Sequence, residues 1–276
     1  MVELLLRRSS SLWIGLAIVG LVVGAAALSC FWTPYPPAAL DIPHRLAAPS
    51  AAHWLGSDAL GRDVVSGLLA GSRVSLLVGV IAVGVGLTLG VALGLIAAAA
   101  KGWVEDAIMK ISDFAFAFPA LLMAILLTAT YGPGVVNAIL AIGVANAPIF
   151  ARLTRSAANG VLTQEYILAA RAAGRGPVAI AFVHVLPNIA PGLIVQATIQ
   201  FAIAILAEAA LSYLGLGAQP PLVSWGRMLA DAQPWLFNSP RLAIAPGVAI
   251  AVSVLGLNFV GDGLRDALDP KLRARR

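Results

Sequence analysis

Long runs of apolar residues constrain the fold of this chain more than any other feature. A helix needs about 20 apolar residues to cross the roughly 30 Å hydrocarbon core of a bilayer. Six stretches are candidate spans, residues 12–32, 74–100, 107–130, 134–151, 189–216 and 242–261. With 60% hydrophobic and only 11% charged residues, the chain would not stay dissolved as a globular domain. We therefore predict an all-α integral membrane protein, a bundle of six transmembrane helices.

A closed β-barrel can also span a bilayer, but its strands alternate apolar and polar residues over about ten positions. Residues 78–100 are apolar on every face and do not fit that pattern. The helical interpretation is therefore favoured.

Lysine and arginine are distributed unequally between the two sides of the six spans. With the N-terminus in the cytosol, 13 of the 18 basic residues fall inside and five fall outside. Cytosolic loops carry the excess of Lys and Arg in membrane proteins. We therefore expect both termini in the cytosol, and we attribute the net charge of +5 to membrane topology rather than to nucleic-acid binding.

The first span has an alternative interpretation as a cleaved signal peptide. Arg7 and Arg8 precede its apolar core, and the sequence from Ala27 to Cys30 is similar to a lipoprotein cleavage site. The apolar stretch is long for a signal core, and its removal would conflict with the charge distribution. We therefore expect a retained helix.

The connection between the first two spans, residues 33–73, is expected outside the membrane. Its first half holds prolines at positions 34, 36, 37, 43 and 49, which favour extended chain. Apolar residues at 64, 65, 68 and 69 then share one face of a short helix, which could lie in the interface or simply lead into the second span. We divide the chain into an N-terminal tail and first helix (1–32), this outer segment (33–73), a five-helix core (74–266) and a basic tail (267–276).

Glycines and turn residues indicate how the spans pack. Gly86, Gly90 and Gly94 recur at every fourth position of the second span, which lets another helix approach closely. The short sequence Tyr131-Gly132-Pro133-Gly134 joins the third and fourth spans in a tight turn. We expect an antiparallel hairpin there.

Residues 152–188, between the fourth and fifth spans, form the one sizeable polar stretch among the apolar segments, and we call them the elbow. Thr163 can cap a helix whose first turn holds Glu165 and whose last turn holds Arg171, before Gly174 ends it. One narrow stripe of this helix carries Tyr166, Ala169, Ala170 and Ala173. Because three of the four are alanines, the stripe permits close approach of a partner backbone.

A second short helix is expected to begin at Pro177 and to stop at or before Leu186, because Pro187 disfavours helix in the preceding residue. Ordinary connections between helices have about two to eight residues, and longer ones tend to be functional or disordered. The alternative is that the elbow is only a solvated connector.

The sequence carries no recognisable enzyme site. None of its three lysines follows a glycine, so the P-loop that binds ATP is absent. His44, His53 and His184 are scattered without a metalloprotease motif, and Cys30 is the only cysteine, so we expect no metal or cofactor on this chain.

Ionisable groups inside a span are costly, which makes Glu208 informative. It shares about 120° of arc on the fifth span with Gln196 and Gln200, so one side of that helix is polar. These three residues could line a translocation path, or they could form hydrogen bonds between helices.

Several motifs resemble one family, the inner-membrane permeases of ATP-binding-cassette (ABC) importers, and specifically the second permease of the dipeptide, oligopeptide and nickel group. The family's cytosolic loop has the form EAA, three residues, Gly, nine residues, I-x-L-P. Ala169-Ala170, Gly174 and Leu186-Pro187 match its spacing, while Leu168 replaces the Glu and His184 takes the Ile position. The resemblance extends to the sequences at residues 53–63, 211–226 and 261–270, and it covers nearly the whole chain beyond the first helix.

The resemblance implies that the elbow is a coupling helix that docks into a separate ATPase subunit. The residues it assigns to that contact are Glu165, Tyr166, Ala169, Ala170, Arg171, Gly174, His184, Leu186 and Pro187. It also implies a bacterial inner-membrane complex of two permeases, two ATPases that hold ATP and Mg, and an external substrate-binding protein. Loss of the Glu at Leu168 removes one polar contact, for which Glu165 could substitute.

By this resemblance the complex imports di- or oligopeptides by alternating access, and nickel or another small solute is the alternative. No cluster of His or Cys within the spans favours nickel. An ion-gradient-driven secondary transporter is a less favoured alternative, because no inverted repeat is visible. A membrane scaffold is also less favoured, because it would not need a polar face on the fifth span.

Overall fold

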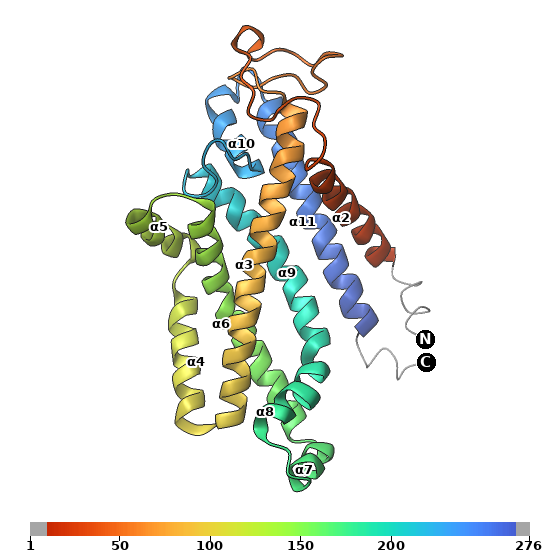
Figure 1. Cartoon of the computed structure of the whole chain (residues 1–276), viewed down its shortest axis with the longest axis vertical. Coiled ribbons are helices and arrows are strands. Elements are labelled where there is room, and N and C mark those ends of the chain that lie inside the picture. Colours follow the sequence, from red (N-terminus) through yellow and green to blue (C-terminus); the bar gives the residue numbers. More distant parts are fainter. Residues whose placement is uncertain (1–9, 269–276) are drawn as a thin grey trace.

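The computed structural model describes residues 10–268 and is a bundle of long helices around α3 (Val64–Ala100) (Figure 1). Within these residues, five helices are long and apolar enough to cross a bilayer. They are α2 (Ser10–Leu28), α3, α6 (Val135–Leu162), the helix that ends with α9 (Leu186–Tyr213), and α11 (Arg241–Leu268). Apart from one isolated bridge between Ser57 and Asp63, residues 10–268 contain no β-structure. The all-α membrane fold expected from the sequence is confirmed.

The third expected span is broken rather than straight. It consists of α4 (Gly102–Ala117) and α5 (Ala120–Tyr131), which are bent by 84° relative to each other. Phe118 is extended and Pro119 stands at the N-cap of α5. A proline disfavours helix in the residue before it and supplies no N–H of its own, so the helix ends there. The prediction of one continuous span over 107–130 was wrong, and the described chain has six spans only if this bent pair counts as one.

Two other boundaries differ from the sequence expectation. α3 begins at Val64, so the last ten residues of the expected outer segment 33–73 belong to this helix, which leads without a break into the second span. α6 continues to Leu162 and so contains the first part of the elbow. With 37 residues, α3 is about 55 Å long and reaches well beyond the hydrocarbon core. The expected basic tail 267–276 lies almost entirely outside the described residues.

Glycines bring α3 and α6 into close contact. A Cβ atom added at Gly86, Gly90 or Gly94 would lie between 2.5 and 2.7 Å from atoms of α6. From the other side, a Cβ at Gly143 would lie 2.9 Å from the side chain of Val85. The predicted role of the three glycines is confirmed, and their partner is α6. Because lipid provides no hydrophobic drive for helix association, such close van der Waals packing holds the pair together.

The first and last described helices form a second tight pair. A Cβ added at Gly15 would lie 2.6 Å from the backbone of Val260, and one at Gly263 would lie 2.5 Å from the side chain of Leu12. The start of α2 therefore packs against the end of α11, and the two helices run antiparallel. Their outer faces carry exposed apolar side chains, including Leu21 and Leu255, as expected for lipid contact.

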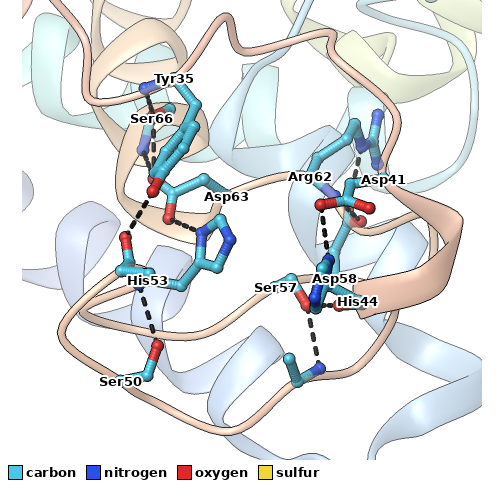
Figure 2. A network of polar contacts seen from close by, with 12 residues as sticks. Tyr35, Asp41, His44, Ser50, His53, Ser57, Asp58, Arg62, Asp63 and Ser66 are labelled. Atoms are coloured by element: carbon cyan, nitrogen blue, oxygen red, sulfur yellow. Dashed lines mark hydrogen bonds and ion pairs between the residues drawn. The ribbon is translucent and has the colours of Figure 1, made fainter.

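Residues 33–63 lie above the start of α3 (Figure 1), and we call them the outer cap. Figure 2 shows the polar contacts within it. Asp63 is its centre. One carboxylate oxygen of Asp63 lies 2.9 Å from His53 Nδ1, and the other accepts hydrogen bonds from the N–H and the hydroxyl of Ser66 at 2.8 Å each, which caps α3. Ser66 Oγ in turn accepts from the N–H of Tyr35, whose ring lies 4.6 Å from that of His53. His53 and Asp63 therefore hold the cap on the end of the helix.

An arginine joins the outer cap to α10 (Trp225–Ala232). Arg62 Nε donates to Asp58 at 2.6 Å, and its Nη2 donates to Asp231 of α10 at 2.9 Å. Asp231 also pairs with Arg227 at 3.0 Å. Burial alone would lower the pKa of the Arg62 guanidinium, but the bond to Asp231 and the charge of Asp58 outweigh burial and raise its pKa above the ordinary value. Arg241, at the start of α11, adds hydrogen bonds to two carbonyls of the cap.

The α3–α6 contact predicts that Gly90→Ala lowers the free energy of unfolding of the purified chain in detergent by about 1–3 kcal/mol, because the added methyl overpacks a closed interface. Gly84→Ala is the matched control, since a Cβ there meets nothing within 4 Å and alanine favours helix. Chemical denaturation of both variants measures the difference. Equal midpoints for the two would contradict the packing described here.

The Arg62 bridge predicts that Asp231→Asn loosens the outer cap, because it removes the charged partner of Arg227 and one of the two charged partners of Arg62. Hydrogen exchange of residues 33–63 should become about tenfold faster in this variant. Asp41→Asn is the control, because the pair between Asp41 and His44 is exposed, and exchange should change less than about twofold. Similar exchange in both variants would show that the bridge does not hold the cap.

Candidate functional site

The elbow lies at the end of the molecule opposite the outer cap (Figure 1). Its short helix α7 (Glu165–Ala172) is anchored by Ile167, whose side chain is fully buried. Ile180 and Val185 from the second half of the elbow lie in the same hydrophobic cluster, together with Ala98 of α3 and Ala158 of α6. Three buried apolar side chains therefore fix the elbow to the bundle. The isolated isoleucine in a polar, alanine-rich segment was the sequence signal for this anchor, and the sequence reasoning missed it.

The two ends of α7 confirm one predicted cap and correct the other. Gly174 has φ +79°, and the N–H of Arg175 bonds to the carbonyl of Ala170, a Schellman arrangement that ends the helix. Thr163 does not cap α7: it ends α6, and its hydroxyl donates to the carbonyl of Gly160. Gln164 takes the N-cap position without a side-chain bond. α6 runs farther than expected, so only Thr163 and Gln164 separate the two helices.

The second half of the elbow does not end where the sequence predicts. A helix begins at Pro177, as expected, but residues Pro177–Tyr213 form one helix of 37 residues. It contains α8 (Pro177–Ile180), the π-helical turn η2 (Ala181–Val185) and α9. The wider π turn sits just before Pro187, and Asn188 Nδ2 donates to the carbonyl of His184 at 2.7 Å. The helix therefore passes the proline, and the elbow is continuous with α9.

The predicted contact residues of α7 lie mostly on its free side. Tyr166, Ala169 and Ala173 are exposed, and Ala170, which follows buried Ile167 by three positions, is half-buried, so most of the stripe is free of the bundle. His184 comes later in the chain than Tyr166 but lies close to it in space, and the centroids of their two rings are 6.2 Å apart. Glu165 is exposed in the first turn. Leu186 and Pro187 belong to the start of α9 and do not share this stripe.

Arg171 stands apart from the other predicted contact residues. It follows buried Ile167 by one helical turn, so it lies beside the face of α7 that packs on the bundle, although its side chain is exposed. There it lines a pocket together with Lys101 at the end of α3 and Arg175.

Glu208 lies in a closed hydrogen-bond network rather than beside an open space. Its side chain is 1% exposed, and its carboxyl oxygens accept from Ser75 of α3 at 2.9 Å and from Ser212 of α9 at 2.7 Å. Ser75 Oγ accepts from the N–H of Trp225, and Ser212 Oγ accepts from the N–H of Ala218. Glu208 thus joins α3, α9 and the start of α10. Of the two roles that the sequence left open for it, this arrangement corresponds to hydrogen bonding between helices.

The two glutamines on the same side of α9 differ in burial. Gln200 is 2% exposed, and its Oε1 makes no hydrogen bond to the described residues. Gln196 is half-buried. α9 also exposes apolar side chains, including Ile194, Ile199 and Ile203. A role of the polar residues in lining a path stays a prediction, and among the three the position of Gln196 fits it best.

Comparison with known proteins places these features in a family. The family described as "Binding-protein-dependent transport system inner membrane component" matches residues 90–274. The chain is 42% identical to the dipeptide transport system permease protein DppC of Alkalihalophilus pseudofirmus, over 98% of this chain and 88% of that protein. It is 38% identical to the nickel transport system permease protein NikC of Escherichia coli, over 95% of this chain and 96% of that protein.

A solved structure shares the fold. An inward-facing form of the MetNI methionine ABC transporter matches with a TM-score of 0.62 and 20% identity, over 74% of this chain and 97% of that chain. The family match, the relatives and the helical bundle agree with one another. The chain belongs to the binding-protein-dependent transport system inner membrane component family and is an inner-membrane permease subunit of an ABC importer.

Proposed function

We propose that this permease imports di- or oligopeptides as one half of a pore, and that the elbow couples the pore to a separate ATPase. The observation that carries the coupling proposal is the construction of α7. Its inner face is fixed by Ile167 in the core of the bundle, while its outer face presents Tyr166, Ala169 and Ala173. A segment held in this way moves with the helices to which it is anchored.

The continuity of the elbow with α9 supports transmission of that movement. A displacement of α7 would be transmitted through the hydrophobic cluster to Ile180 and Val185, which belong to the 37-residue helix Pro177–Tyr213. The far half of the same helix carries Glu208, bonded to α3 and packed close to α10 beneath the outer cap. Closure of two ATPases on ATP and Mg would therefore displace a stiff element that runs from the elbow to the outer end of the pore.

We place the elbow and both termini in the cytosol and the outer cap outside the membrane. Lys101, Arg171 and Arg175 gather at the elbow end, which fits the cytosolic excess of basic residues. The outer cap then faces an external substrate-binding protein, and a second permease completes the pore. Peptides are the proposed substrate because the relative with the higher identity of the two is a dipeptide permease, with nickel as the alternative.

Docking of the alanine stripe predicts that Ala169→Glu abolishes coupling. A charge forced into a close helix contact without a partner costs about 3 kcal/mol or more, which weakens ATPase binding roughly 100-fold. The tagged variant should reach the membrane at the normal level, but ATPase subunits and ATPase activity should no longer co-purify, and uptake of a labelled dipeptide should be lost.

Ala172→Glu is the control for this substitution, because Ala172 is equally exposed on the same helix but lies about 110° from the centre of the stripe. It should retain most uptake. Normal uptake by the Ala169→Glu variant would falsify the coupling role of α7. Uptake of nickel but not of peptide by the unmodified complex would leave coupling intact and change the substrate.

The Glu208 network predicts that Glu208→Gln lowers the thermal stability of the purified chain in the absence of any substrate or partner. The amide of glutamine would place an N–H donor where the hydroxyls of Ser75 and Ser212 already donate. We therefore expect the free energy of unfolding to fall by about 1–3 kcal/mol. Gln196→Ala should leave stability unchanged and alter uptake kinetics instead. Unchanged stability of Glu208→Gln together with lost uptake would assign Glu208 to the translocation path.

A further inference from the structure

A pocket of about 370 Å³ lies between the elbow and the bundle, on the inner side of α7. Its walls come from the last turns of α3, the last turns of α6 and the start of the helix that begins at Pro177. Most of the lining is apolar, for example Leu95, Leu162 and Ile180. Three basic side chains, Lys101, Arg171 and Arg175, also line it, and it has no acidic lining residue.

The three cations have no anionic partner in the described part of the chain. No ion pair within residues 10–268 involves Lys101, Arg171 or Arg175. The acidic residue closest in sequence to Lys101 is Glu105, and it is already paired with Arg155. The side chains of all three are exposed, and positive charges gathered without compensation around one pocket repel one another, so an anion placed among them would be stabilised.

The position of the pocket along the bundle corresponds to the membrane interface. Lys101 directly follows the apolar end of α3, and Trp103 is 80% exposed two residues later. Exposed tryptophan beside lysine is typical of the headgroup level of a membrane protein. α4 then turns back with exposed Ile111 and Phe114, which suit contact with lipid chains.

We propose that this pocket binds the headgroup of an anionic phospholipid. The phosphate would lie among Lys101, Arg171 and Arg175, where the two guanidinium groups can donate paired hydrogen bonds to its oxygens. The apolar walls would contact the glycerol and the first part of an acyl chain. Basic pockets between helices on the cytosolic side are suited to such headgroups, whereas a soluble anion gains nothing from the apolar lining.

The bound lipid would brace the elbow. Arg171 and Arg175 flank the turn at Gly174, and Lys101 belongs to the junction between α3 and α4. One headgroup would therefore tie α7 to the end of α3 by ionic contacts, in addition to the apolar anchor at Ile167. This inference rests on the pocket and on the cytosolic placement of the elbow proposed above, and it does not depend on the coupling role of the stripe.

The test is native mass spectrometry of the full-length chain in detergent, titrated with phosphatidylglycerol or with phosphatidylcholine. The unmodified chain should retain phosphatidylglycerol at least about tenfold more tightly, because each basic residue near an anionic headgroup contributes about fivefold in affinity. The double variant Lys101→Gln with Arg175→Gln should lose this preference. The double variant Lys101→Arg with Arg175→Lys, which keeps both charges, should retain it.

Lys110→Gln is the matched control, since it removes an exposed cation of α4 that does not line the pocket. It should bind phosphatidylglycerol like the unmodified chain. Equal retention of the two lipids, or full retention by the Lys101→Gln, Arg175→Gln variant, would overturn the proposal. Full displacement of phosphatidylglycerol by millimolar inorganic phosphate would assign the pocket to a soluble anion and would also overturn it.

Discussion

The close contact between α3 and α6 is the interaction on which the rest of the structure depends. In a bilayer two helices gain nothing by hiding apolar side chains from lipid, so they associate through packing and hydrogen bonds. Gly86, Gly90 and Gly94 allow α3 to approach α6 so closely that even a methyl group would collide with the opposite backbone or Cβ atoms. This pair supplies the surface against which Ile167 and Ile180 of the elbow are buried. Without it the elbow would have no fixed position.

Residues at both ends of α3 contact other parts of the molecule. At the outer end, Asp63 caps the helix and at the same time holds His53 of the outer cap. At the inner end, Lys101 lines the basic pocket beside the elbow. In between, Ser75 bonds to Glu208 and so joins α3 to the long helix that begins in the elbow. Two stiff helices connected by a buried polar contact can carry a displacement from one end of the bundle to the other.

Much of the fold and part of the site were predictable because they depend on local rules. Three features follow from the residues themselves: the length of the apolar stretches that the bilayer requires, the close packing at the three glycines of α3, and the end of α7 at Gly174. Two of the predictions that failed concern prolines. Pro119 breaks a span that was expected to be straight, whereas Pro187 is accommodated in a helix that was expected to stop. A proline imposes the same local penalty in both places, and only the surrounding helix decides whether a π turn and a side-chain bond can offset it.

The sequence by itself determined that this chain is a helical membrane protein with a polar elbow, because the bilayer demands long apolar runs and the elbow motif is contiguous along the chain. Only the tertiary structure decided which side of α7 is free and which is anchored, since that depends on where Ile167 meets α3 and α6. The same holds for Glu208, whose partner Ser75 lies 133 positions away in sequence. It also holds for the basic pocket, which brings Lys101 at the end of α3 next to Arg171 and Arg175 of the elbow. Contacts between residues far apart in the chain leave no periodic or local pattern, so they exist only once the helices have packed.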